Sequence, residues 1–109
     1  MYQNLIRPLM FRLDPERAHD LTLQALQLAG AFPLIAKFLT RFFHAHSPPS
    51  TVDAFGLSFP NPLGLAAGYD KDGIAIRGLA SLGFGHIEVG TVTPKPQKGN
   101  PRPRIYRIP

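Results

Sequence analysis

Residues 61–73 read NPLGLAAGYDKDG, a run of small and apolar residues that stops at three consecutive charges held between two glycines. The apolar part, residues 62–68, predicts a buried strand, and residues 74–82 have the pattern of a helix. A second strand is predicted over residues 86–93. A strand, a helix and a second strand in this order predict a β-α-β unit with parallel strands, which places the chain in the α/β class.

The charges at 70–72 follow the first predicted strand, and Thr91 lies at the carboxyl end of the second. Ligands of parallel α/β folds gather at these carboxyl ends. The small residues 66–68 would let a flat ligand lie against bare backbone and accept hydrogen bonds from the backbone N–H groups. This pattern favours a planar, partly anionic cofactor, with Lys71 as a cation at its rim. A solvated turn is the alternative, because Asp-Gly is a common turn signal. No glycine-rich nucleotide fingerprint is present.

Residues 1–46 have a helical pattern. The sequence Asp-Pro-Glu at 14–16 predicts a helix start, with an acidic N-cap and proline at the first helical position, and Gly30 is a plausible stop. A further helix over residues 32–43 is amphipathic, with aromatic side chains on one face and basic ones on the other. Its apolar face would either pack against the rest of the protein or lie in a membrane interface.

The remaining segments are turn-rich. Residues 47–51 have the composition of a linker, and residues 52–59 predict a short hairpin. The tail, residues 94–109, holds five prolines and five basic residues and no clear period. One β-α-β unit cannot close a sheet, and an α/β barrel takes about 200 residues or more. We therefore expect residues 52–109 to be the incomplete beginning of a barrel, in a truncated chain.

The composition limits the function classes. The net charge is +5 and cysteine is absent, so no disulfide or thiolate metal site can form and anionic partners are favoured. We expect no metal site, no signal peptide and no membrane span. A basic nucleic-acid-binding module is an alternative suggested by the tail. The tail lacks a groove-reading helix and offers only Tyr106 for base stacking, which argues against nucleic acid.

Three blocks in this order resemble a known family. They are LDPERAH at 13–19, NPLGLAAGYDKDG at 61–73 and GLASLGFGHIEVGTVTPKPQKGNPRPRIYRIP at 78–109. Together they are similar to the quinone-linked (class 2), membrane-associated dihydroorotate dehydrogenases. The resemblance implies a (β/α)8 TIM barrel that carries FMN, preceded by a small helical domain that forms the mouth of a quinone tunnel. The implied domains are 1–46, helical and membrane-associating, and 52–109, the first β/α units of the barrel.

The resemblance also implies residue roles. The FMN contacts would be Ala67, Gly68, Tyr69, Asp70, Lys71 and Thr91. Lys71 would also touch the substrate, and His19 and Arg107 would line the quinone site. The family usually has leucine or phenylalanine where this chain has Tyr69. The family's catalytic base would lie beyond residue 109, so the 109-residue chain is expected to be inactive alone.

The implied reaction is the oxidation of (S)-dihydroorotate to orotate in de novo pyrimidine (UMP) biosynthesis. FMN would accept the hydride, and a membrane quinone, ubiquinone or menaquinone, would be the final electron acceptor. The N-terminal helices would attach the protein to the cytoplasmic face of a bacterial inner membrane. A soluble fumarate- or NAD-linked dihydroorotate dehydrogenase, or another flavin barrel enzyme, is the alternative. The soluble enzymes are not expected to carry the helical leader.

Overall fold

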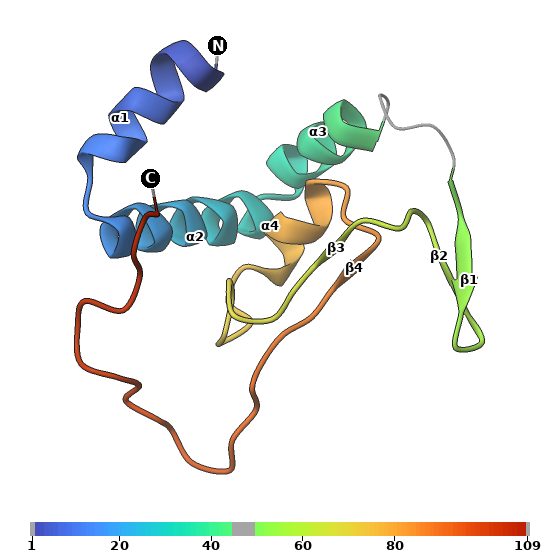
Figure 1. The fold of residues 1–109 in the computed structure, drawn as a ribbon. Helices are drawn as coiled ribbons and strands as arrows, with labels where there is room; N and C mark the ends of the chain where they lie inside the picture. Colours follow the sequence, from blue (N-terminus) through green and yellow to red (C-terminus); the bar gives the residue numbers. More distant parts are fainter. Residues whose placement is uncertain (1, 45–49, 109) are drawn as a thin grey trace.

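The computed structural model describes residues 2–44 and 50–108. Helices occupy the N-terminal part, followed by a hairpin and a β-α-β unit (Figure 1). In chain order the elements are η1 (Tyr2–Ile6, a π-helical turn), α1 (Arg7–Arg12), α2 (Pro15–Ala31), α3 (Pro33–His44), β1 (Val52–Ala54), β2 (Leu57–Phe59), β3 (Gly64–Leu65), α4 (Ile76–Ser81) and β4 (His86–Ile87).

Helix α2 begins as the sequence predicts. The Asp14 carboxylate accepts hydrogen bonds from the backbone N–H groups of Glu16 (3.0 Å) and Arg17 (3.2 Å), and Pro15 occupies the first turn. These bonds satisfy amides that have no partner within the helix. Helix α2 ends at Ala31, one residue beyond the predicted stop.

Helix α3 covers the predicted amphipathic segment and turns sharply away from α2. Within the described residues, no single helix is long and apolar enough to cross a membrane, although α2 and α3 together pass that test of length and composition with a 107° bend between them. The side chain of Ala36 on α3 is half-buried, whereas Leu34 and Phe38 are 83% and 68% exposed. One side of α3 therefore packs on the protein while its other side remains open.

The strands form two small sheets. Strands β1 and β2 pair antiparallel with Val52 opposite Phe59, which confirms the predicted hairpin. Strand β3 pairs with β4 in parallel, with Gly64 opposite His86 and Leu65 opposite Ile87. Strands β3 and β4 are parallel and α4 lies between them in the chain, which confirms the predicted β-α-β unit. Both strands are shorter than predicted, and the described residues form no closed barrel.

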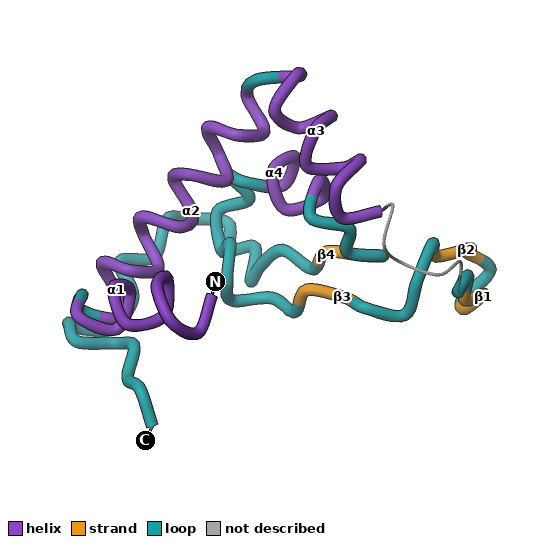
Figure 2. Tube along the Cα trace, turned by 90° about the horizontal axis from the view of Figure 1, so that it is seen from above, coloured by secondary structure: helices purple, strands orange, loops and turns teal. Residues whose placement is uncertain are grey.

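Helix α4 is the centre of the packing. It lies inside the corner between α2 and α3 (Figure 2), and its Leu79 is 2% exposed. Glycines allow α2 and α4 to touch through their backbones. A Cβ added to Gly78 would collide with the carbonyl oxygen of Leu26, and one added to Gly30 would lie 2.6 Å from the nitrogen of Gly78. The helical segment and the β-α-β unit are therefore packed directly on each other.

The C-terminal segment returns to the helices. Residues 88–108 contain no helix or strand and run back to the beginning of α2 (Figure 1). Side chains of this segment bind Glu16 on α2 and the last carbonyls of α1. The predicted linker at 47–51 lies largely outside the described residues, since 45–49 are not described, and the predicted domain boundaries stay predictions.

Candidate functional site

The candidate site lies where β3 and β4 end. Because these strands are parallel, the segments after Leu65 and after Ile87 leave the sheet at the same edge. The backbone N–H of Glu88 donates to the carbonyl of Leu65 at 2.9 Å, which continues the pairing one residue further. The loop 66–73 and the segment that holds Thr91 are therefore neighbours, as the sequence predicts.

The first residues of this loop leave its backbone uncovered. Ala66, Ala67 and Gly68 are all exposed. Gly68 has φ +107°, a conformation that L side chains rarely adopt, and no atom lies within 4 Å of the position that its Cβ would occupy. The loop thus offers an open, side-chain-free surface on which a flat ligand could lie. This observation favours the cofactor hypothesis at Ala67 and Gly68 and shows that the residues present fit such a group.

Asp70 behaves differently from its neighbours. It is 2% exposed, and its carboxylate accepts from the N–H groups of Ile74 (3.0 Å) and Ala75 (2.8 Å) at the entry to α4. The backbone N–H of Gly73 also donates to the Asp70 carbonyl at 3.4 Å. Asp70 therefore lies in a turn, but its side chain is buried and not solvated as the turn alternative expects. A contact of Asp70 with FMN stays a prediction, and the backbone rather than the carboxylate would have to make it.

Lys71 is exposed within this loop, and Thr91 is exposed in the segment that follows β4. Within residues 2–44 and 50–108, no ion pair involves the Lys71 ammonium, although Asp70 and Asp72 flank it in the sequence. An unpaired cation next to an open backbone surface can bind an anionic ligand without first breaking a salt bridge. The geometry agrees with the predicted position of Lys71 at the rim, while its contacts with cofactor and substrate stay predictions.

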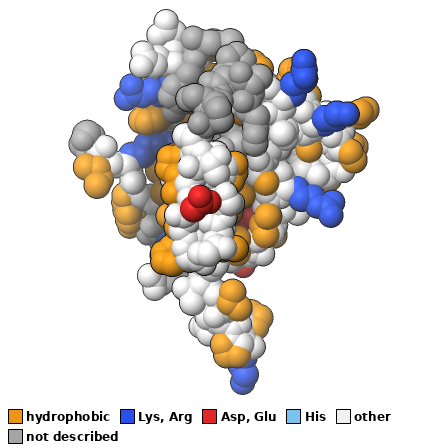
Figure 3. Space-filling view, turned by 90° about the vertical axis from the view of Figure 1, so that its right-hand side faces the viewer, with side chains coloured by type: hydrophobic (Ala, Val, Ile, Leu, Met, Phe, Trp, Pro, Cys, Tyr) orange, Lys and Arg blue, Asp and Glu red, His pale blue; other side chains and the backbone are white. Residues whose placement is uncertain are grey.

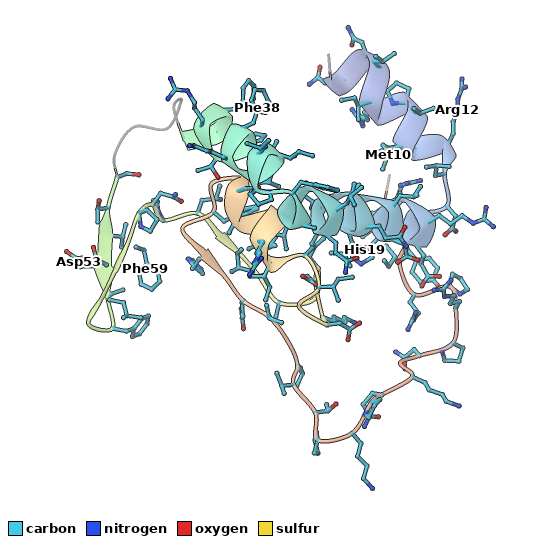
Figure 4. The ribbon with its side chains drawn as sticks, turned by 180° about the vertical axis from the view of Figure 1, so that it is seen from behind. Met10, Arg12, His19, Phe38, Asp53 and Phe59 are labelled. Atoms are coloured by element: carbon cyan, nitrogen blue, oxygen red, sulfur yellow. The ribbon has the colours of Figure 1, made fainter. Side chains whose placement is uncertain are left out.

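Tyr69 points toward the helices. Its hydroxyl donates to the Oγ1 atom of Thr22 on α2 at 2.9 Å, and its ring meets the ring of His19 edge-on, with centroids 5.0 Å apart. His19 lies on the side of α2 that faces the loop (Figure 4). Sequence reasoning missed Thr22. Its position three residues after His19 places it on the same helix face, but nothing local connects it with Tyr69.

Arg107 closes the end of α1. Its guanidinium donates to the carbonyls of Met10 (3.0 Å), Phe11 (3.2 Å) and Leu13 (2.8 Å). The Arg107 Cζ atom also lies 4.6 Å from the centroid of the Phe11 ring. A cation at a helix C-terminus meets carbonyls without intrahelical partners and the negative end of the helix dipole. Arg107 therefore touches α1 while His19 touches Tyr69, and their shared quinone role stays a prediction.

Glu16 is a second residue whose partners the sequence does not predict. The Asp-Pro-Glu motif predicts a carboxylate in the first turn of the helix. Glu16 is in fact 7% exposed, and its carboxylate accepts a hydrogen bond from the Nε–H of Arg104 at 3.1 Å. Arg102 lies 3.7 Å from the other Glu16 oxygen and 3.9 Å from Asp20. This cluster ties the C-terminal segment to α2. Among the described residues, no group of three or more histidine, cysteine or acidic side chains could hold a metal ion.

The chain is similar to known proteins along its whole length. A family model described as dihydroorotate dehydrogenase matches residues 50–109. The chain is 57% identical to a dihydroorotate dehydrogenase (quinone) of Roseiflexus sp. over 96% of its own length and 29% of that protein's. It is 58% identical to the dihydroorotate dehydrogenase (quinone) of Methylococcus capsulatus over 100% of its length and 31% of that protein's. The chain thus spans about a third of the length of these curated relatives.

A solved structure agrees with these similarities. The crystal structure of DHODH from Eimeria tenella in complex with ferulenol aligns with 86% of this chain and 23% of that chain. The TM-score is 0.68 and 43% of the aligned residues are identical. The relatives match residues before 50 as well as after it, so the similarity includes the helices that the family model does not cover.

We expect Asp70 and Asp72 to differ in their effect on stability. Asp70→Ala leaves two backbone amides at the entry to α4 unpaired and should lower the free energy of unfolding by about 1–3 kcal/mol. Asp72→Ala removes an exposed carboxylate with the same charge and should change it by less than about 0.5 kcal/mol. Urea unfolding of the product of the complete open reading frame measures both. Equal effects of the two substitutions would contradict the capping role.

Proposed function

Because this chain belongs to the dihydroorotate dehydrogenase family, we propose that its protein oxidises (S)-dihydroorotate to orotate in pyrimidine biosynthesis, with FMN as cofactor and a membrane quinone as final acceptor. The observation that carries this proposal is the identity of 57–58% with two relatives named as the quinone enzyme, over 96–100% of the chain. That match includes residues 1–49, which the family model leaves out. The soluble enzymes are not expected to carry this helical segment.

The β3-α4-β4 unit would be the first part of a (β/α)8 barrel. Its parallel strands, joined by a helix, are the repeating unit of that architecture, and ligands of such barrels bind at the carboxyl ends of the strands. The open loop after β3 has the position that this rule requires. The helices α1 to α3 would form the small preceding domain.

FMN, when bound, supplies the hydride acceptor of the reaction. The exposed backbone of Ala67 and Gly68 would bind its flat ring system, and Thr91 would add a hydroxyl from the neighbouring segment. Lys71 would place a positive charge beside the ring and the anionic substrate, where it stabilises negative charge that develops during hydride transfer. None of these side chains would act as the catalytic base, which we expect from another part of the protein.

The quinone site would lie at the helices. His19 and Arg107 both have donor groups that suit a quinone carbonyl. Arg107 also holds the end of α1, and His19 lies beside Tyr69 of the cofactor loop, 5.0 Å between ring centroids. The proximity of His19 to this loop supports a site in which a quinone reaches the neighbourhood of the flavin from the helical side.

The helices would also touch the membrane, at the cytoplasmic face of a bacterial inner membrane. Leu5 and Leu9 of the N-terminal helices are 68% and 64% exposed, and on α3 Leu34 and Phe38 are 83% and 68% exposed. Figure 3, which faces the side of the β1–β2 hairpin, shows hydrophobic side chains on the surface with several Lys or Arg side chains around them. An apolar face flanked by cations suits the boundary between lipid head groups and acyl chains. These exposures support peripheral attachment.

The tail is a weaker candidate for nucleic-acid binding than its charge implies. Three of its five basic residues are engaged within the chain: Arg102 and Arg104 with Glu16, and Arg107 with α1. Cations that are already paired release fewer counterions when they meet phosphates. The contacts therefore favour a structural role for this segment.

The first test concerns cofactor and acceptor. The product of the complete open reading frame should be purified with visible flavin absorption bands, and dihydroorotate should bleach them. A ubiquinone or menaquinone analogue should support turnover much better than fumarate or NAD. A preparation without flavin bands would exclude the cofactor, and equal turnover with fumarate would instead favour the soluble class.

The second test concerns Lys71. Lys71→Ala removes the cation beside the proposed flavin and should slow dihydroorotate-driven flavin reduction by about 100-fold or more, with FMN still bound. Stopped-flow measurement of flavin bleaching isolates this step from quinone chemistry. Lys37→Ala, an exposed lysine on α3, is the matched control and should reduce flavin at the wild-type rate. A wild-type rate in Lys71→Ala would show that Lys71 is a surface residue of a turn with no role in flavin reduction.

The third test concerns the membrane. Phe38→Ser removes an exposed aromatic side chain from α3 and should weaken binding to anionic lipid vesicles by about tenfold, the effect of losing one buried phenylalanine. Vesicle co-sedimentation measures the binding. Phe55→Ser is the control, since Phe55 is 99% exposed at the tip of the β1–β2 hairpin, away from the helices. Equal loss from both substitutions would argue against insertion through α3.

A further inference from the structure

Two consecutive side chains anchor the candidate cofactor loop to two different helices. The Asp70 carboxylate binds backbone amides at the entry to α4, while the Tyr69 hydroxyl binds Thr22 on α2. Gly68, just before them, has φ +107° and no side chain of its own to hold it. The backbone of this part of the loop is therefore held between α2 and α4 by its two neighbours in sequence.

The hydrogen bond to α2 has a defined direction. The Thr22 hydroxyl donates to its own helix, to the carbonyls of Ala18 (3.0 Å) and His19 (2.9 Å). Its single proton is therefore occupied, so its oxygen acts as acceptor and the Tyr69 O–H is the donor at 2.9 Å. Phenylalanine at this position would keep the ring contact with His19 but could not make this bond. The bond joins segments 47 residues apart.

The same contact places His19 against the loop. His19 and Thr22 lie on one face of α2, and the Tyr69 ring meets the His19 ring edge-on at 5.0 Å. Lys71, two residues further along, is exposed and, among the described residues, has no ion pair with α2. Asp70, which lies between Tyr69 and Lys71, keeps its own bonds to the entry of α4, so loss of the Tyr69 bond leaves the anchor next to Lys71 in place.

We propose that Tyr69 is a positioning residue for the quinone: by donating to Thr22, it holds the loop 67–72 and the His19 face of α2 together as one wall of the quinone site. The proposal rests on the proposed function for the identity of the acceptor. The hydrogen bond between the hydroxyl groups of Tyr69 and Thr22 can hold the loop on α2 without any contact between Tyr69 and the reacting atoms.

The experiment uses the product of the complete open reading frame with Tyr69→Phe, Thr22→Val and the double substitution. Each single substitution should raise the KM for a ubiquinone analogue by about three- to tenfold, the effect of one lost hydrogen bond. In Thr22→Val, whose residue lies on α2 and not in the cofactor loop, the KM for dihydroorotate and the rate of flavin reduction should stay within about twofold of wild type. The double variant should match the single ones, because both remove the same bond.

Two further variants separate positioning from general stability. Thr40→Val on α3 removes a hydroxyl that donates only to its own helix, to the carbonyl of Ala36 at 2.9 Å, and should leave the quinone KM unchanged. Thr22→Ser keeps the acceptor and should restore wild-type behaviour. Hydrogen exchange of the amides of residues 66–72, measured in flavin-free protein, should be faster in Tyr69→Phe and Thr22→Val and unchanged in Thr40→Val.

The outcomes distinguish this proposal from the proposed function. If the wild-type protein oxidises dihydroorotate but Tyr69→Phe keeps both its quinone KM and its loop exchange, the positioning role is wrong. Additive effects of Tyr69→Phe and Thr22→Val would also overturn it. If the wild-type protein binds no flavin, the proposed function fails, and the exchange measurement alone decides whether the hydroxyl pair holds the loop.

Discussion

The contact on which the rest of this structure depends is the backbone approach of α4 to α2. It requires glycine at two positions, because a Cβ on Gly78 would meet the carbonyl oxygen of Leu26 and a Cβ on Gly30 would lie 2.6 Å from the nitrogen of Gly78. A larger separation of the helices would also move the loop that enters α4 away from α2. The Tyr69–Thr22 hydrogen bond, at 2.9 Å, tolerates little such movement. Close helix packing therefore sets the distance that the contacts of the candidate site need.

The polar contacts around α2 then complete the attachment of the helices. Glu16 at its beginning binds Arg104, Thr22 in its middle binds Tyr69, and Arg107 holds the end of α1. Each partner comes from a segment that follows β3 or β4. A buried carboxylate such as that of Glu16 requires a partner, since an unpaired charge in the interior is costly. The helices are thus held by groups of the β-α-β unit and its C-terminal extension, and they form one packed body with it.

The sequence predicted the features that local patterns encode. The Asp-Pro-Glu helix start, the hairpin around Gly56 and the parallel β-α-β unit were all confirmed, because each depends on residues close in the chain. The strands were predicted too long. Each strand of the parallel pair has one neighbour among the described residues, so only the residues opposite that neighbour form a ladder. The partners of Glu16 and Tyr69 could not be predicted, because they lie 88 and 47 residues away and no periodicity specifies which side chains meet.

The charged end of the small-residue strand has side chains in two different environments. The sequence left open whether Asp-Lys-Asp-Gly was a turn or a ligand site; these residues do form a turn, and the ligand contacts stay a prediction. Asp70 is buried and bonded to the backbone, and Tyr69 is bonded to α2, so both have directions fixed by the fold. Residues 67–72 form turns and bends, and Lys71 is left exposed there without an ion pair among the described residues. A cation without an ion pair can meet a developing negative charge without first losing a partner. The bonds of Tyr69 and Asp70 thus help to fix the backbone that carries Lys71, the proposed ligand-binding cation.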